Sequence, residues 1–181
     1  ANHLVSLGHR RIGFIGAPTY YNFAQMRLDG YREALGNNGL QFDPSLVRIT
    51  QLEDEAAREA AELLLAGDQP PTALLCVTDI QALGAMAAVR RRGLVPGKQV
   101  TVIGYDGLDF GRHTNPPLTT MAQPQADSGH RIGEILLAII DGGDPKDYQE
   151  LRRAELLRRE SDGPVWVSNE HSSSNTLEEM T

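Results

Sequence analysis

Several features that would place this chain in a specialised class of protein are missing from its sequence. It has one cysteine among 181 residues, Cys76, so no internal disulfide is possible, and this usage is typical of a reducing compartment. No apolar run is long enough to cross a bilayer. The first residues, ANHLVSLGHRR, lack the charged leader, apolar run and cleavage site of a secretory signal. These absences predict a cytoplasmic protein with no membrane partner.

Positive charge is also scarce, since the formal net charge is -7. Nucleic-acid binding needs a concentrated basic face, and the only basic clusters are short ones at 90–92, 152–153 and 158–159. The first cluster lies at a predicted helix end, where cations complement the helix dipole. We therefore do not expect this segment itself to hold DNA or RNA.

Recognisable catalytic and metal-binding patterns are absent as well. There is no Gly-x-Ser-x-Gly elbow and no Walker-type phosphate loop, and GFIGA at 13–17 lacks the third glycine of a dinucleotide loop. Cys76 lies within a strand-like run and is expected to be core. The histidines are scattered without metal-ligand spacing: His3, His9, His113, His130 and His171. The sequence therefore predicts no enzyme, no metal and no cofactor.

What is present is an alternation of strand-like and helix-like segments. Short apolar runs at 11–16, 46–50, 72–77 and 99–104 predict strands, and helical patterns at 22–37, 53–66 and 80–92 lie between them. PPLTTM, a helix at 124–140 and a last strand within 149–160 follow. Repeated βαβ units predict an α/β fold with a doubly wound parallel sheet. The opening residues are typical of the last turns of a helix that stops at Gly8, which suggests a fragment of a longer protein.

Arg27 interrupts the apolar side of the predicted helix at 22–37. A guanidinium in a dry interface costs several kcal/mol unless it has a partner. We therefore expect Arg27 to reach a polar cleft or an acid, and the alternative is that its head reaches water past the helix edge. On a helical wheel Arg27 falls within the expected buried stripe, which consists of Phe23, Met26, Gly30, Tyr31 and Ala34.

Asp79 follows the strand-like run TALLCVT and opens the next helix. One interpretation is an N-cap, because aspartate accepts free backbone amides at the positive end of a helix. The other is a ligand site, because open α/β sheets bind ligands beyond the carboxyl ends of their strands. Arg27 would lie near the same edge, so an acid and a base could hydrogen-bond a polyhydroxylated ligand from two sides. Each such charge-assisted bond contributes roughly 1.5–3 kcal/mol.

The helix after Asp79 has almost no polar face between Ile80 and Val89. A helix that is apolar all round is covered on more than one side. The sheet must cover one side, and either a neighbouring helix or a second subunit covers the other. In so short a chain we favour the second subunit.

Four motifs resemble the effector-binding core of the LacI family of bacterial transcriptional regulators. They are LGHRRIGFIGAP from Leu7, RLDGYREAL from Arg27, VTDIQALGAMAAVRRRGLVPGKQVTVIGYDG from Val77 and PPLTTMAQPQADSGHRIGEILL from Pro116. Together they cover most of the chain from His3 to about Ser161. The combination of GYD with PLTT and QP separates this family from periplasmic sugar-binding proteins of the same fold.

The resemblance implies a two-lobed periplasmic-binding-protein type I fold, preceded in the full protein by a helix-turn-helix DNA-binding domain. It implies that this chain is the C-terminal lobe, without the DNA-binding domain and most of the first lobe. Residues 1–161 would form the effector-binding lobe, of which about 121–140 crosses to the first lobe in relatives. Without that lobe, the apolar side of this crossing helix is expected to be exposed or packed on another molecule. Residues 162–181 would form a disordered tail.

The resemblance also implies a binding site. In the family, the arginine of the RLxGY motif and the aspartate that opens the helix after the third strand hold the effector; these are Arg27 and Asp79. The preceding loop carries Tyr21 and Phe23, whose rings could stack on a sugar, although core packing is an equal alternative for Phe23. The stretch after the second strand adds Gln51. GYDG at 104–107 replaces the commoner GYDD, so a polar group near the lobe boundary is lost.

The helix at 80–92 resembles the dimerisation surface of the family. The resemblance therefore implies a homodimer whose contact residues are Leu83, Met86, Ala87 and Arg90. The partners expected for the chain are a small hydroxylated effector, taken to be a sugar, and a second copy of itself, with DNA bound only through the absent helix-turn-helix domain. The alternatives are a periplasmic sugar-binding protein of a transport system, which a cleavable signal in the full gene would favour, and an enzyme, against which the missing catalytic residues argue.

Overall fold

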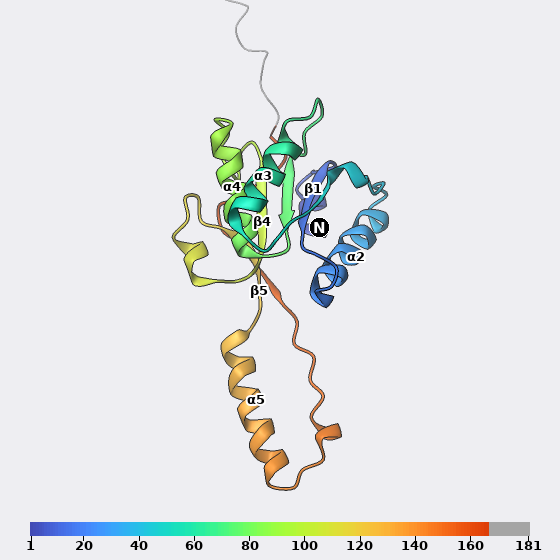
Figure 1. Cartoon of the computed structure of the whole chain (residues 1–181), viewed down its shortest axis with the longest axis vertical. Coiled ribbons are helices and arrows are strands. Elements are labelled where there is room, and N and C mark those ends of the chain that lie inside the picture. Colours follow the sequence, from blue (N-terminus) through green and yellow to red (C-terminus); the bar gives the residue numbers. More distant parts are fainter. Residues whose placement is uncertain (167–181) are drawn as a thin grey trace, which may run out of the picture.

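The computed structural model describes residues 1–166, which are built around one six-stranded sheet (Figure 1). Its strands lie in the order β2-β1-β3-β4-β5-β6 and pair in parallel, except that β6 is antiparallel to β5. The predicted doubly wound parallel sheet is confirmed, with one antiparallel strand added at its edge. The strand bounds are β1 (Ile12–Gly16), β2 (Val47–Ile49), β3 (Ala73–Cys76), β4 (Thr101–Asp106), β5 (Thr119–Ala122) and β6 (Glu155–Leu157).

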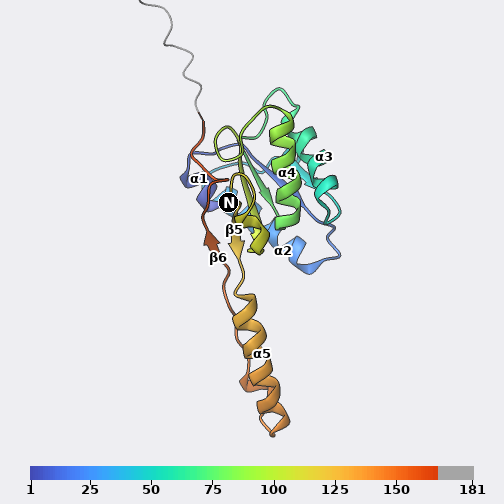
Figure 2. The same ribbon diagram turned by 90° about the vertical axis from the view of Figure 1, so that its left-hand side faces the viewer.

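Two apolar layers cover the two faces of the sheet, because successive side chains of a strand point to opposite faces. Phe14 of β1 packs towards α1 and α2, whereas its neighbour Ile15 packs towards α3 and α4. Figure 2 shows α3 and α4 side by side along one side of the sheet. The helix bounds are α1 (Asn2–Ser6), α2 (Asn22–Asn37), α3 (Asp54–Leu65), α4 (Asp79–Arg91) and α5 (Gln125–Ile140), with 3-10 turns at Pro44–Leu46, Asp109–Arg112 and Pro145–Asp147.

A neighbouring helix explains why α4 lacks a polar face. α3 packs directly along α4, and Gly84 marks the closest approach. A β-carbon at this position would overlap the backbone oxygen of Asp54 and lie 2.8 Å from the backbone nitrogen of Arg58. The expectation that a second subunit supplies this cover is therefore corrected, because α3 takes that place.

The buried side of α2 differs in part from the expected stripe. Tyr31 and Ala34 are buried as expected, whereas Met26 is 73% exposed and Gly30 is exposed. The stripe that packs on the sheet is rotated towards Ala24, Leu28 and Leu35. Tyr31 anchors it, since its ring stacks on Phe14 at 4.9 Å and its hydroxyl donates to the backbone oxygen of Ile12 at 2.8 Å.

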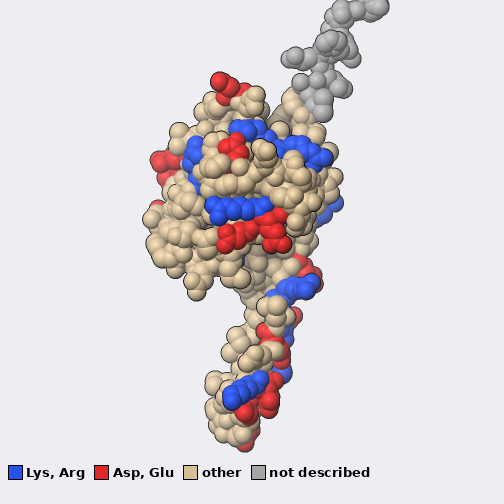
Figure 3. All heavy atoms as spheres, turned by 90° about the vertical axis from the view of Figure 1, so that its right-hand side faces the viewer, with Lys and Arg blue, Asp and Glu red and all other residues tan. Residues whose placement is uncertain are grey.

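Residues 123–154 form an arm that projects from the sheet (Figures 1 and 2). It consists of α5 and the chain that returns to β6, and no residue of α5 is buried. Arg131 of α5 is paired with Glu150 of the returning chain at 2.5 Å, and acidic and basic side chains lie side by side along the arm in Figure 3. Of the apolar side expected to be uncovered, Ile132 and Leu136 are 65% and 56% exposed, whereas Ile135 and Ile139 are partly buried. Leu137 and Ile140, which were not expected, are also exposed, at 64% and 70%.

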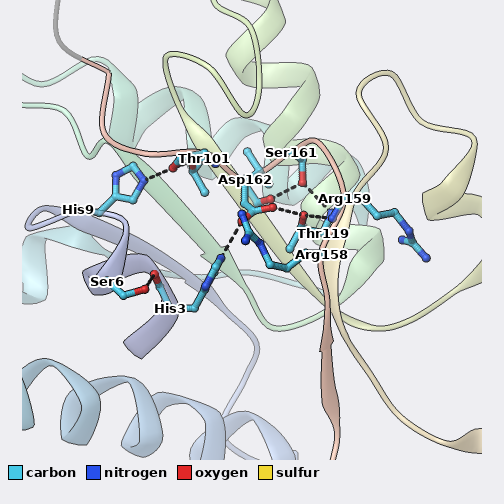
Figure 4. A network of polar contacts seen from close by, with 11 residues as sticks. His3, Ser6, His9, Thr101, Thr119, Arg158, Arg159, Ser161 and Asp162 are labelled. Atoms are coloured by element: carbon cyan, nitrogen blue, oxygen red, sulfur yellow. Dashed lines mark hydrogen bonds and ion pairs between the residues drawn. The ribbon is translucent and has the colours of Figure 1, made fainter.

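The chain after β6 crosses the amino ends of β4 and β5, where buried polar contacts fix it (Figure 4). The Ser161 hydroxyl donates to the backbone oxygen of Val102 at 2.6 Å and accepts from the backbone nitrogen of Thr119 at 2.8 Å. Gly163 continues this contact, because its backbone nitrogen donates to Thr101 Oγ1 at 3.0 Å and its oxygen lies 3.0 Å from His9 Nε2.

Asp162 is the centre of a second group of contacts in Figure 4. Its side chain is completely buried and accepts a hydrogen bond from Thr119 Oγ1 at 2.6 Å. His3 Nε2 lies 2.7 Å and Arg158 Nε 3.1 Å from its other oxygen. The fold therefore continues beyond the expected boundary at residue 161. Of the predicted disordered tail, residues 167–181 lie outside the described residues.

None of the helices within residues 1–166 combines the length and the apolar character that spanning a membrane requires.

Candidate functional site

The candidate site lies at the carboxyl edge of the parallel sheet, where β1, β3 and β4 end. In α/β sheets of this kind, loops and helix starts at this edge supply ligand-binding side chains. Here the edge carries the start of α2, the start of α4 and the turn that follows β4. Together these elements bring Arg27, Asp106 and several aromatic rings to one place.

Arg27 reaches from α2 across the ends of β3 and β4. Its Nη1 donates to the backbone oxygen of Val77, and its Nη2 lies 3.8 Å from Oδ1 of Asp106. The guanidinium carbon is 3.5 Å from the ring centroid of Tyr105 and 4.8 Å from that of Phe23. Burial lowers the pKa of Arg27, against the opposing effects of Tyr105 and Asp106, and the side chain stays 18% exposed. The expected acidic partner of Arg27 is therefore present, although it comes from β4.

Asp106 is the functional candidate that the sequence reasoning missed. It ends β4 and is the one non-glycine residue with a positive φ within residues 1–166, at 130°. Burial raises the pKa of its carboxyl, the charge of Arg27 works against this shift, and the charge of Asp79 adds to it. A perturbed acid in strained backbone is typical of a functional site. The predicted fourth strand ended at residue 104, whereas β4 extends to residue 106. An acid at the end of this strand is the sequence feature that could have identified Asp106.

Asp79 does not face an open cleft, contrary to its expected place in the site. Its side chain is fully buried, and both of its oxygens accept hydrogen bonds, from the backbone nitrogen of Leu108 at 2.8 Å and from Thr120 Oγ1 at 2.5 Å. It is not the N-cap either. Thr78 caps α4 through a hydrogen bond from the backbone nitrogen of Gln81 to its hydroxyl, and Asp79 is the first residue of the helix.

Three neighbouring aromatic rings form a row, and the ring at one end, that of Phe23, contacts Arg27. Tyr21 precedes α2, and its ring lies 4.4 Å from that of Tyr20 and 5.5 Å from that of Phe23. Phe23 is partly buried and stacks on Tyr21 on one side, with the Arg27 guanidinium over its ring. Tyr20 ends the row and is 70% exposed. The structure thus places Phe23 against Arg27 and Tyr21 against Phe23.

Gln51 is exposed in the loop after β2, at the same edge. Its backbone oxygen is held by the buried side chain of Gln81, whose Nε2 also donates to the backbone oxygen of Gly16 and to Thr50 Oγ1, both at 2.9 Å. Gln81 was not predicted as a site residue. It joins the ends of β1 and β2 to α4 and so fixes the loops around the site.

A pocket of about 380 Å³ adjoins this site. It extends from Arg27 and Tyr105 along the sheet face to Ala1 and His3, and most of its lining is apolar. Neither Asp79 nor Gln51 lines it. Within residues 1–166 no group of three His, Cys, Asp or Glu side chains is placed to hold a metal ion.

The four residues predicted for a dimer contact lie differently on α4. Met86 is fully buried in the core and cannot reach a partner, whereas Leu83 and Ala87 are partly buried and Arg90 is exposed. Arg90 donates from Nη2 to the backbone oxygen of Asn115 in the loop before β5. Leu83, Ala87 and Arg90 follow helical spacing and share one side of α4.

Comparisons with known proteins agree with this architecture. A family model for a periplasmic binding protein-like domain matches residues 1–161. The chain is 36% identical over 160 residues to the HTH-type transcriptional repressor CytR of Escherichia coli (strain K12), a match that covers 88% of this chain and 47% of the relative. The chain thus spans about half the length of the curated relatives it matches.

Solved structures give the same result. A regulatory protein of the LacI family from Chloroflexus aggregans matches with a TM-score of 0.84 at 33% identity, over 90% of this chain and 58% of that one. The lac repressor dimer bound to operator and the anti-inducer ONPF matches with a TM-score of 0.80 at 30% identity, over 89% and 55% of the two chains. The predicted resemblance is confirmed, and the chain belongs to the periplasmic-binding-protein-like family, as the lobe found in LacI-family transcriptional regulators.

Proposed function

We propose that this chain is the effector-sensing lobe of a LacI-type transcriptional regulator and that it binds a small hydroxylated effector, a sugar, at the carboxyl edge of the sheet. The observation that carries the proposal is the pair of Arg27 and Asp106. Their charged atoms are 3.8 Å apart, which is longer than a direct hydrogen bond. A ligand hydroxyl between them can accept from the guanidinium and donate to the carboxylate.

The surroundings of the pair suit a ring with polar edges and apolar faces. Tyr20 and Tyr21 offer ring surface that continues from Phe23, the ring in contact with Arg27, and aromatic faces pack well on the apolar face of a sugar. Gln51 adds an exposed amide at the same edge. Every group that would bind the effector therefore belongs to an element that ends or begins at this edge.

In the proposed full-length regulator, the effector lies between this lobe and a second lobe. Binding would favour one arrangement of the lobes over another and so alter the spacing of two DNA-binding heads in a dimer, which is a population shift. We assign the dimer contact to the side of α4 that carries Leu83, Ala87 and Arg90. DNA would be held by a helix-turn-helix domain outside this chain, and such a regulator works in the cytoplasm without a cofactor.

The main alternative is a solute-binding protein of a transport system, which would use a similar lobe. The relatives named above are transcription regulators, which supports the regulator. A helix-turn-helix segment encoded upstream in the same gene would exclude the transport protein, and a cleavable signal would exclude the regulator.

The proposal is tested by titration calorimetry of the full-length gene product against a panel of pentoses, hexoses and nucleosides. Arg27→Ala and Asp106→Asn are each expected to reduce affinity by about 10- to 100-fold, because each removes a charge-assisted hydrogen bond. Arg32→Ala is the matched control, since Arg32 lies on the exposed side of the same helix and pairs with Asp29 at 3.3 Å. Equal affinities for the wild type and both site variants would refute the assigned site.

A further inference from the structure

Asp79 is closed to a ligand by burial. The side chain is 0% exposed, and each of its oxygens already accepts one hydrogen bond, from Leu108 and from Thr120. An effector hydroxyl would have to enter a closed space to reach it. All hydrogen bonds of the Asp79 side chain are to groups of the protein itself. The role of Asp79 therefore depends on the segment that these bonds hold in place.

That segment is the turn at 106–108, directly after β4. Asp79 holds the backbone nitrogen of Leu108 directly. It holds the backbone nitrogen of Gly107 through Thr120, whose hydroxyl accepts from Gly107 at 3.3 Å and donates to Asp79 at 2.5 Å. One buried carboxylate thus fixes two successive backbone amides of the turn, one directly and one through Thr120. Buried hydrogen-bonded networks of this kind make the segments that they join rigid.

The turn needs such support because its backbone is unfavourable. Asp106 has a φ of 130° and Gly107 a φ of 79°, and a positive φ at a non-glycine residue costs on the order of 1–3 kcal/mol. Gly107 also packs tightly, since a β-carbon there would lie 2.7 Å from the β-carbon of Ala122. The glycine that replaces the commoner aspartate at this position is therefore matched to the local geometry.

Space for the Asp79 carboxylate is provided by Gly104 of β4. A β-carbon at Gly104 would overlap Oδ1 of Asp79 and lie 3.2 Å from the β-carbon of Ala82. The carboxylate is therefore fixed from the side of the strand as well as from the turn. Strand, turn and helix start meet at this one group.

We infer that Asp79 is a positioning residue, which does not touch the effector but holds the turn at 106–108 so that the Asp106 carboxylate faces Arg27. The inference rests on the proposed function of Arg27 and Asp106. Asp79, which was expected to contact the ligand, instead supports Asp106, the residue proposed to make that contact.

The first test needs no effector and uses NMR spectroscopy of the 181-residue chain. Asp79→Asn is expected to move the amide resonances of Gly107 and Leu108 and to lower the titration midpoint of the Asp106 carboxyl, because it removes a nearby negative charge and loosens a buried turn. Thr120→Val is a milder variant that releases Gly107 alone. Asp109→Asn is the matched control, since this carboxylate lies in the same loop with 91% of its side chain exposed. Unchanged Gly107 and Leu108 amides and an unchanged Asp106 midpoint in Asp79→Asn would overturn the inference.

The second test is a double-mutant cycle with D-ribose as the titrated probe of the full-length gene product. Asp79→Asn is expected to lower affinity about tenfold in the wild-type background and less than about twofold in an Asp106→Ala background, because its effect acts through Asp106. Additive losses would show that Asp79 acts independently of Asp106 and would overturn the inference. If D-ribose binds neither the wild type nor any variant, D-ribose is excluded as the effector, and the NMR test decides the role of Asp79.

Discussion

Asp106 combines a positive φ of 130° with a carboxylate that is only 22% exposed. Burial raises the pKa of this carboxyl even though Arg27 stands opposite, so ionisation of Asp106 costs the folded state free energy. A residue that only served stability would carry neither cost. Such local costs in stability are typical of binding sites, where polar groups are positioned for a ligand and not for the stability of the fold.

Asp106→Asn is therefore expected to stabilise the ligand-free chain at pH 7. A folded-state pKa above the ordinary value means that stability declines as the pH rises from the ordinary pKa through the raised one. The neutral amide avoids this loss, and the gain should be at most about 1 kcal/mol and should disappear below about pH 4. Urea unfolding at about pH 7 measures the expected gain in stability, and unfolding at about pH 3.5 shows whether the gain disappears. If Asp106→Asn is less stable than the wild type at about pH 7, ionised Asp106 does not destabilise the folded chain.

Asp162 is expected to behave in the opposite way. Burial alone would raise its pKa, but hydrogen bonds from Thr119 and His3 and the charge of Arg158 outweigh burial, so its pKa is lowered. Its ionised form thus stabilises the fold above the ordinary pKa of aspartate, and this stability is lost as the pH falls through the lowered value. Asp162→Asn should cost about 1–3 kcal/mol at pH 7.

The pH profile distinguishes this effect from a general loss of packing. Between about pH 5 and pH 2 the wild type should lose more stability than Asp162→Asn, so the two curves converge. Asp68→Asn, at an exposed carboxylate in the loop before β3, is the control and should follow the wild type. Parallel curves for Asp162→Asn and the wild type would show that the charge of Asp162 is not responsible.

Single-residue roles were predictable from sequence only where a residue breaks a pattern. Arg27 interrupts an apolar stripe, and the structure gives it the acidic partner that this position requires. Asp79 also breaks its pattern, but no spacing rule reveals that Leu108 and Thr120, 29 and 41 residues further along, occupy both of its oxygens. Asp106 follows a tyrosine and precedes a glycine, which makes it indistinguishable from an ordinary turn residue in sequence.

At the scale of secondary-structure elements, apolar periodicity was sufficient to predict each of the four longer helices. α2 matches its predicted range, and α3, α4 and α5 begin or end within one residue of theirs. The antiparallel pairing of β6 was not predictable, because it depends on how the arm turns back after α5. The rotated stripe of α2 has a similar cause, since the position of α2 depends on the ring of Tyr31 stacked on Phe14.

Two helical glycines provide a test of how closely α3 and α4 pack. Gly84→Ala should destabilise the chain by about 1–3 kcal/mol or more, because the new β-carbon meets backbone atoms of Asp54 and Arg58 that cannot rotate away. Gly30→Ala on α2 is the matched control, since no atom lies within 4 Å of the place its new β-carbon would take and the helix is favoured by about 0.5–1 kcal/mol. Urea denaturation should therefore give changes of opposite sign. A stabilising Gly84→Ala would disprove the close contact.

At the scale of the whole molecule, the sheet is packed between helices, whereas the arm is not packed against the rest of the chain. Helices cover both faces of the sheet, whereas α5 extends from it with no buried residue. The chain spans about half the length of its relatives. In the proposed full-length regulator, α5 would cross to a second lobe. The position of α5 is consistent with a crossing segment whose apolar side requires a partner surface.

The exposed side of the arm makes self-association of the isolated chain the expected behaviour. Ile132, Leu136 and Ile140 lie at helical spacing and are 65%, 56% and 70% exposed, and an apolar strip of this kind promotes contacts between copies. Replacing all three with glutamine should shift sedimentation velocity profiles towards the monomer at concentrations where the wild type associates. Because these side chains contribute nothing to either apolar layer of the sheet, the midpoint of thermal unfolding should change by less than about 2 °C.

The control for this experiment exchanges residues on the charged side of the same helix. Arg131→Gln breaks the pairs with Glu134 and Glu150 without altering the apolar strip, so it should leave association as in the wild type. If the triple glutamine variant associates as strongly as the wild type, the arm is not the contact surface, and the partly exposed side of α4 with Leu83 and Ala87 becomes the surface to mutate next. A full-length protein that contains the second lobe should show no dependence on these three residues for association, because that lobe would cover them.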